Sequence, residues 1–233
     1  MENSEDTPNL SVKFIKEHVK DLVTRFADTN VFIPSTNPFS VFMAGSPGAG
    51  KTEFSKSFCE IMQRKDPNLH IVRIDADEIK EFIPYYNGKN SDAVQGASAL
   101  GVQKLFDHVQ SHNQNLVLDG TFGDLKISLE NVERSLTRNR RVGIVYIYKE
   151  PLEAWDITQK REVLEGRVVP KETFVDCLFA AKDNVNEVKS QLGNKVRLSL
   201  LIRNGKLKPH FNIDKIDNYL KIKYTREALL ALL

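Results

Sequence analysis

Residues 45–52 have the composition and spacing of a loop that binds phosphate groups. Gly45-Ser46-Pro47-Gly48-Ala49-Gly50-Lys51-Thr52 matches the pattern G-x-x-x-x-G-K-[ST] in full. The glycines let successive backbone N–H groups point into one concavity, and a helix that follows adds partial positive charge. We therefore predict that this loop holds the triphosphate of ATP. Lys51 would reach the β- and γ-phosphates, and the Thr52 hydroxyl would ligate Mg²⁺.

A carboxylate follows a second apolar segment and is suited to work beside this loop. Asp119 comes directly after Leu116-Val117-Leu118, which is typical of a buried strand. An acid at the end of such a strand can orient Mg²⁺ or a water molecule bound to it. The alternative is an ordinary strand-end aspartate that starts a turn at Gly120.

Two further carboxylates leave another strand in Ile74-Asp75-Ala76-Asp77-Glu78. The carboxyl ends of strands line the ligand crevice of an open α/β sheet, and an acid there can accept the proton of an attacking hydroxyl group. Asp75 and Glu78 have the spacing of a capping box for the next helix. We assign Asp75 to capping and Asp77 to chemistry. The spacing alone leaves a structural role for Asp77 equally open.

Two arginines flank the end of a predicted helix late in the chain, in Lys160-Arg161-Glu162 and in Gly166-Arg167-Val168. An arginine delivered to the transferring phosphoryl group accelerates the reaction by roughly 10³–10⁵. Gly166 would give the segment the freedom to close over the site. The residue types by themselves slightly favour a solvated basic helix end, which the helix dipole stabilises.

The elements that must position these residues alternate between strands and helices. Such alternation predicts an α/β fold with a mostly parallel sheet and helices on both faces. The phosphate-binding loop has the expected context, since the apolar run 41–44 precedes it and a helical pattern follows it. The predicted further strands are 69–74, 115–119, 142–148 and 196–202, and the predicted helices include 11–27, 92–112, 124–137, 170–192 and 226–232.

The chain divides into three predicted parts. Residues 1–39 comprise a disordered start, up to residue 9, and an amphipathic helix that packs on the domain. Residues 40–205 form the nucleotide-binding domain, and residues 206–233 form a helical extension. The short turn signal Asn204-Gly205 marks the second boundary.

The composition restricts the classes of partner. Of 233 residues, 41% are hydrophobic and 27% are charged, with a formal net charge of only +2. This balance provides no broad field for nucleic acid, and no segment approaches the roughly 20 apolar residues of a membrane span. The polar, acidic start predicts no secretory signal. Cys59 and Cys177 fall in apolar helical patterns, so we expect buried free thiols and a cytoplasmic location.

The signatures of other nucleotide-binding classes are missing from the sequence. No Asn-Lys-x-Asp follows the loop, which argues against a GTPase, and no Leu-Ser-Gly-Gly-Gln is present, which argues against a transporter ATPase. An acid after the second strand and arginines late in the chain favour a small-molecule kinase.

Taken together, four segments resemble the zeta toxin family of P-loop kinases: residues 45–52, 74–77, 118–121, and Arg161 with 167–170. The resemblance covers about residues 40 to 192 and implies a parallel sheet flanked by helices. It also implies ATP-dependent phosphorylation of a small-molecule hydroxyl group, for which UDP-N-acetylglucosamine is the family's best-known acceptor. A small antitoxin protein that blocks the ATP site would be a partner.

The same resemblance assigns roles to individual residues. Asp77 corresponds to the catalytic base, Arg161 and Arg167 to contacts of the γ-phosphate, and Thr121 to a substrate contact. Gln103 stands where members often have an acid that holds the sugar. With Asp119 and Thr121 it completes the expected substrate-binding set.

Members often have an arginine after the Asp/Glu-Gly-Thr element, but Phe122 and Gly123 follow Thr121 here. Both this departure and Gln103 concern the acceptor, so phosphoryl transfer is expected while the identity of the acceptor stays open.

Two alternatives remain. One is a polynucleotide or nucleoside kinase, although the weak basic character of the chain argues against a polymer as the acceptor. The other is an ATP-gated binding module without catalysis, with the terminal helices as its partner surface.

Overall fold

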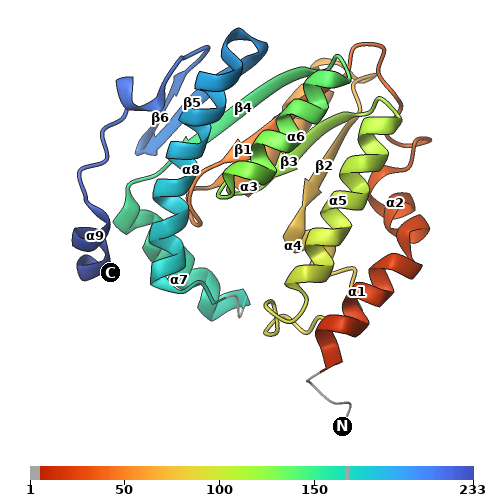
Figure 1. Ribbon diagram of the computed structural model, residues 1–233, viewed down its shortest axis with the longest axis horizontal. Helices are drawn as coiled ribbons and strands as arrows, with labels where there is room; N and C mark the ends of the chain where they lie inside the picture. The colour runs from red at the N-terminus through yellow and green to blue at the C-terminus, as the bar shows by residue number, and fades with distance from the viewer. Residues whose placement is uncertain (1–5, 166–167) are drawn as a thin grey trace.

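In the part of the chain that the structure describes, six strands form one sheet in the order β2–β3–β1–β4–β5–β6 (Figure 1). The computed structural model describes residues 6–165 and 168–233 of the chain. Strands β1 to β5 run parallel, and β6 runs antiparallel to β5. The predicted α/β fold with a mostly parallel sheet is therefore confirmed. The strand bounds are β1 Phe39–Ala44, β2 Ile71–Asp75, β3 Asn115–Asp119, β4 Arg141–Tyr148, β5 Val196–Asn204 and β6 Lys206–His210.

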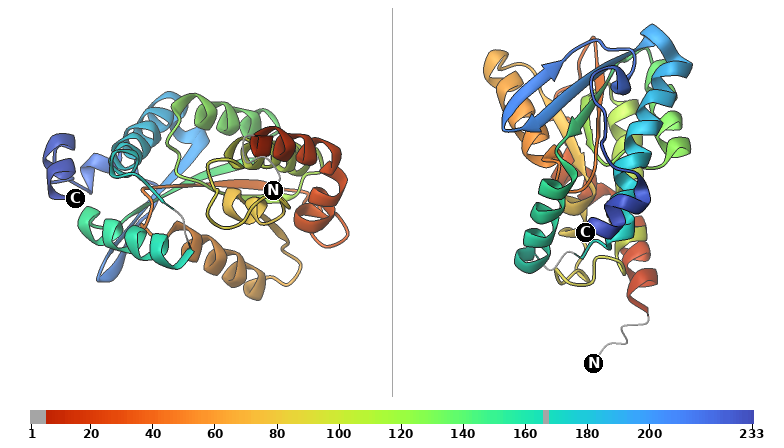
Figure 2. Two further views of the ribbon diagram at one scale, coloured as in Figure 1. Left: turned by 90° about the horizontal axis from the view of Figure 1, so that it is seen from below. Right: turned by 90° about the vertical axis from the view of Figure 1, so that its left-hand side faces the viewer.

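Helices cover both faces of this sheet (Figure 2). Helices α5, α6 and α8 lie on one face, and α3 and α7 lie on the other. Crossovers between parallel strands require this arrangement, because each helix returns the chain to the start of the next strand. The helix bounds are α3 Lys51–Lys65, α4 Ala76–Lys80, α5 Gln95–Ser111, α6 Leu125–Thr137, α7 Pro151–Glu165 and α8 Lys171–Leu192.

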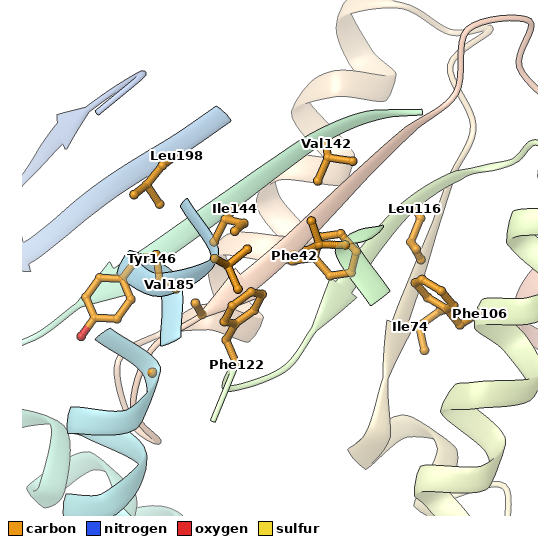
Figure 3. Close-up of a cluster of buried hydrophobic side chains, with 14 of the residues drawn as sticks. Phe42, Ile74, Phe106, Leu116, Phe122, Val142, Ile144, Tyr146, Val185 and Leu198 are labelled. Atoms are coloured by element: carbon orange, nitrogen blue, oxygen red, sulfur yellow. The ribbon is translucent and has the colours of Figure 1, made fainter. Parts of the chain in front are cut away.

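The core lies in two layers because successive side chains of a strand point to opposite faces. Phe42 and Ile144 face α5, α6 and α8, in the larger cluster shown in Figure 3. Met43 and Ile147 belong to the smaller cluster on the α3 side. The nearly continuous apolar strands are therefore explained by burial on both faces.

The N-terminal segment forms two helices where one was predicted over 11–27. Helix α1 spans Thr7–Glu17 and α2 spans Val19–Ala27, with the break at His18. Helix α1 begins within the stretch expected to be disordered, and Pro8 in its first turn is well placed because proline tolerates that position. Both helices pack on α5 and place Ile15 and Leu22 in the core, so they extend the helical layer on that face.

The C-terminal segment differs from the predicted helical extension. Residues 206–210 form β6, because Gly205 (φ +74°) turns the chain back along β5. A short 3₁₀ helix, η3 (Ile216–Asn218), and the helix α9 (Arg226–Leu232) follow. Tyr224 Oη donates a hydrogen bond of 2.8 Å to Glu150 Oε1 and ties this segment to the start of α7.

A buried arginine joins the amino ends of three strands. Arg140 donates to Ser40 Oγ at 2.7 Å, to the Phe39 carbonyl at 2.8 Å, and to the Gln114 carbonyl. Burial lowers the pKa of Arg140 to about 10. Its bonds satisfy backbone carbonyls that would otherwise be costly to bury.

No helix in residues 6–165 or 168–233 combines the length and the apolar character needed to cross a bilayer.

Candidate functional site

The predicted phosphate-binding loop connects β1 to α3 at the carboxyl edge of the sheet. Gly50 is the N-cap of α3 and has φ +89°, and Gly48 has φ +71°. A Cβ atom on Gly48 would lie 2.0 Å from the Ala154 carbonyl oxygen of α7. Only glycine therefore allows α7 to pack directly against the loop.

Cationic side chains converge on this loop. Lys51 Nζ donates to the carbonyl oxygens of Gly45 at 2.9 Å and Ser46 at 2.8 Å. From the end of β5, Arg203 Nη1 donates to the Gly50 carbonyl at 2.9 Å. The loop is thus held from two sides by groups that attract phosphate.

The sheet order brings the predicted acids beside the loop. Strand β3 lies between β2 and β1, and Asp75 is in register with Asp119. The side chain of Asp119 is 4% exposed, and its Oδ2 accepts a hydrogen bond of 2.7 Å from Ser55 Oγ of α3. Burial, and then the charge of Asp75, raise the pKa of Asp119 above its ordinary value.

Arg73 binds both of these carboxylates. Its Nη1 lies 2.9 Å from Asp75 Oδ2 and 2.9 Å from Asp119 Oδ2, and its Nη2 pairs with Glu78. Burial opposes the charge of this guanidinium, which is 10% exposed. The hydrogen bond and charge of Asp75, followed by the charges of Glu78 and Asp119, raise the pKa of Arg73 above its ordinary value. Arg73 thus fixes the spacing of the two acids.

Asp75 caps α4 as predicted, and Asp77 lies in the first turn of that helix. Asp75 Oδ1 accepts a hydrogen bond of 2.9 Å from Asp77 N and caps the helix. Glu78 does not complete a capping box, because it pairs with Arg73 and lies 3.3 Å from Lys56. Asp77 Oδ1 is 3.3 Å from the Nζ of Lys80, a buried lysine.

A cavity of about 280 Å³ collects these groups. Asp77 and Arg161 face it from different helices, α4 and α7, together with the loop residues Lys51 and Thr52. The structure therefore brings together most of the predicted catalytic set. Arg167, which we also predicted to contact the γ-phosphate, lies outside the described residues.

A second cavity, of about 650 Å³, lies between α5 and α6 and contains the predicted substrate residues. Gln103, Asp119 and Thr121 all line it. Because Asp119 and Thr121 also line the first cavity, the two cavities are adjacent. We name this second cavity the α5–α6 groove.

The donor groups fit a magnesium ion bound with a nucleotide. Thr52 and Asp119 place oxygen atoms on the same cavity, and Mg²⁺ binds through one or two protein oxygens together with phosphates and water. Within residues 6–165 and 168–233, no cluster of three or more His, Cys, Asp or Glu side chains could hold a metal by itself. The phosphates of the nucleotide would therefore supply several of the ligands.

Sequence reasoning missed three cations of this site: Arg73, Lys80 and Arg203. Arg73 interrupts the apolar strand β2, and a charge within a buried strand requires a partner. Lys80 follows Asp77 by three positions, which is the spacing of an ion pair on a helix. Nothing in the sequence near Arg203 indicates that β5 ends beside the loop.

Comparison with known proteins gives both a family and several similar folds. A model of the zeta toxin family matches residues 23–211. A structure from the PezAT chromosomal toxin–antitoxin system of the human pathogen Streptococcus pneumoniae is similar, with a TM-score of 0.66 and 17% sequence identity. The match covers 94% of this chain and 86% of that one.

Two other solved structures share the fold. The AvrRxo1-ORF1:ORF2 complex with ATP has a TM-score of 0.62 at 12% identity, over 87% of this chain and 65% of that chain. The Pnkp1/Rnl/Hen1 RNA repair complex has a TM-score of 0.51 at 15% identity, over 78% of this chain and 51% of that chain.

Proposed function

Because the chain belongs to the zeta toxin family, we propose that it transfers the γ-phosphate of ATP to a hydroxyl group of a small molecule. The observation that carries this proposal is the cavity at the carboxyl edge of the sheet. There a phosphate-binding loop, a carboxylate and an arginine from three separate elements face one space. This combination suits phosphoryl transfer, since catalysis of that reaction depends on positioning and on charge stabilisation.

At the donor end of the cavity, the loop holds ATP. The backbone N–H groups of residues 45–52 and the Lys51 ammonium bind the phosphates, and Arg161 stabilises the charge of the transferring group. Thr52 and Asp119 would hold Mg²⁺, which neutralises charge on the phosphates when it is bound. Arg167 has the same proposed role as Arg161, from its position in the sequence.

At the acceptor end, Asp77 is the proposed general base. Its carboxylate accepts the proton of the acceptor hydroxyl group, and Lys80 holds this carboxylate from the adjacent turn at 3.3 Å. Buried Lys80 also donates to Ser91 Oγ at 2.7 Å, so the base is tied to the loop between α4 and α5. This pairing supports the proposed role, because it restrains the carboxylate of Asp77.

The acceptor enters through the α5–α6 groove, which lies next to the donor cavity. Gln103, Asp119 and Thr121 are the proposed substrate contacts there. UDP-N-acetylglucosamine, which the family resemblance implies, is the first compound to test. A small antitoxin protein is a proposed partner, in line with the similarity to a structure from a toxin–antitoxin system.

The experiment compares the wild type with Asp77→Asn in a transfer assay with radiolabelled ATP, Mg²⁺ and a metabolite extract. Loss of a general base lowers transfer by about 10²–10⁴ while ATP affinity stays unchanged. Asp214→Asn is the matched control, because the Asp214 side chain is 90% exposed. Retained transfer in Asp77→Asn removes Asp77 from the base role. ATP binding without transfer to any acceptor, already in the wild type, favours the non-catalytic binding module.

A further inference from the structure

The charges along the α5–α6 groove differ from those of the donor cavity. Lys51, Lys80 and Arg161 face the donor cavity, together with the carboxylates Asp75, Asp77 and Asp119. Asp124 and Glu130, by contrast, line the groove from the start and the middle of α6. The donor cavity thus has three cations to balance its carboxylates and to meet a triphosphate, whereas the start and the middle of α6 add acidic side chains to the groove.

Arg134 is the only cation among the described residues that line the groove, and it is already compensated. Its guanidinium pairs with Asp107 of α5 and lies 4.9 Å from the centre of the Phe106 ring. A pyrophosphate carries two negative charges and is normally bound by cations or by a helix N-terminus. At the N-terminus of α6, the Asp124 carboxylate already accepts the hydrogen bond of Ile127 N at 2.9 Å. A pyrophosphate in the groove would therefore be repelled by the acidic side chains, and it would find little positive charge to balance its own.

The floor of the groove is apolar. Leu100, Phe106, Leu118 and Phe122 line it from α5, from β3 and from the loop after β3. Phe122 is held at φ +62°, and its buried ring lies 6.5 Å from that of Phe42 (Figure 3). A phenylalanine in this left-handed conformation is strained, which is common at functional sites. Its contact with Phe42 helps to hold the Phe122 ring in the floor of the groove.

The remaining polar groups of the groove are mostly uncharged. Gln95 and Gln103 line it from α5, Thr121 from the loop after β3, and Asn131 from α6. Amides and hydroxyl groups donate and accept hydrogen bonds and suit the hydroxyl groups of a neutral molecule. Together with the apolar floor they form the usual lining of a small-molecule site.

We propose that the acceptor is a hydroxyl compound without phosphate groups, uncharged or cationic, which lays an apolar face on the floor of the α5–α6 groove. This inference rests on the proposed phosphotransferase function and names its class of acceptor. In the reaction, Asp77 takes the proton of the acceptor hydroxyl group, and the acceptor oxygen forms a bond to the γ-phosphorus of ATP. The bond from that phosphorus to the bridging oxygen of ADP breaks. The products are a phosphate monoester and ADP, and one proton is released.

The first test separates acceptors by charge. A metabolite extract is divided on an anion-exchange column at about pH 8, and each fraction is incubated with the protein, Mg²⁺ and ATP labelled at the γ-phosphate. Lys51→Ala is the control for transfer by this protein. We expect a labelled product from the unretained fraction, and none from the retained fraction or from pure UDP-N-acetylglucosamine. Transfer to UDP-N-acetylglucosamine or to compounds of the retained fraction alone overturns the inference and supports the phosphotransferase. No transfer from either fraction refutes both.

The second test asks whether the acceptor occupies the groove. Ala99 is exposed on α5 and lines the groove, so Ala99→Trp fills the space without entering the core. Ala231→Trp, at an exposed position of α9, is the matched control. We expect Ala99→Trp to lower kcat/KM for the acceptor of the unretained fraction at least about tenfold, through the lost contacts and an added clash. ATP affinity should stay within about twofold in both variants. Unchanged kcat/KM in Ala99→Trp places the acceptor elsewhere and overturns the inference, while phosphoryl transfer itself stands.

Discussion

Replacing Arg73 with methionine removes the cation that binds Asp75, Asp119 and Glu78. The side chains of Arg73, Asp75 and Asp119 are 10%, 9% and 4% exposed, so water cannot take over its role. Breaking a buried ion pair by removing one partner costs about 3–5 kcal/mol, because the remaining charge is left uncompensated. For a chain of this size, that loss lowers the melting temperature by about 6–20 °C.

The destabilisation of Arg73→Met depends on pH with a definite sign. The folded pKa of Asp119 is raised above its ordinary value, first by burial and then by Asp75. The folded chain therefore binds this proton more readily than the unfolded chain does, and lowering the pH through the folded pKa stabilises the fold. Removal of Arg73 raises this pKa further. We expect the difference in the free energy of unfolding between variant and wild type to shrink from about pH 7.5 to about pH 5.

The assay is urea denaturation followed by circular dichroism at several pH values. Arg64→Met is the matched control, because Arg64 pairs with Glu60 in an exposed pair, with side chains 75% and 66% exposed. Such pairs contribute about 0–1 kcal/mol, so the control should change little and show no dependence on pH. A loss below about 1 kcal/mol in Arg73→Met, or a loss that grows toward acid pH, would refute the reasoning.

Three further predictions concern the loop, the base and the core. Gly48→Ala should abolish ATP binding, measured by calorimetry, because its Cβ would lie 2.0 Å from the Ala154 carbonyl. Gly88→Ala, at φ +84° with nothing near its Cβ, should bind ATP normally, and equal affinities in the two variants would contradict the packing argument. Lys80→Met should lower kcat about tenfold in steady-state kinetics, with ATP affinity retained, because the carboxylate of Asp77 loses its ion pair with the Lys80 ammonium. An unchanged kcat would show that this pair is only structural. Arg140→Met should cost about 2–4 kcal/mol in urea denaturation, because it leaves buried carbonyls unpaired, with no change in ATP affinity. A cost near zero would mean that water replaces the guanidinium.

The sequence was most informative where one short segment determines its own backbone conformation. Residues 45–52 predict a strand, a loop and a helix together, and the structure has all three. The adjacency of Asp119 to the loop also followed from local signals, since an apolar strand ending in an acid is typical of this position. The first prediction depends on residues that are close in sequence, and the second depends on an arrangement of strands that recurs in many folds.

What could not be predicted depends on contacts between distant residues. Arg203 reaches the Gly50 carbonyl across 153 positions of the chain, and no local pattern encodes that pairing. Arg73 was visible as a charge in a strand, but its partner Asp119 lies 46 positions away. The strand β6 was missed because its residues, Lys206 to His210, are mostly polar and exposed, and a turn at Gly205 decides their pairing.

The antiparallel strand β6 also affects whether two molecules of the protein can associate through the edges of their sheets. Among the described residues, one side of β6 has no neighbouring strand in the sheet, and an open edge of this kind allows a second chain to add its own strand. Lys206 and Lys208 bring like charges together in any such pairing, and Pro209 lacks the amide hydrogen that the pairing needs. The protein should consequently not form fibres in concentrated solution. Replacing both lysines with isoleucine should allow this edge to pair with the edge strand of a second molecule.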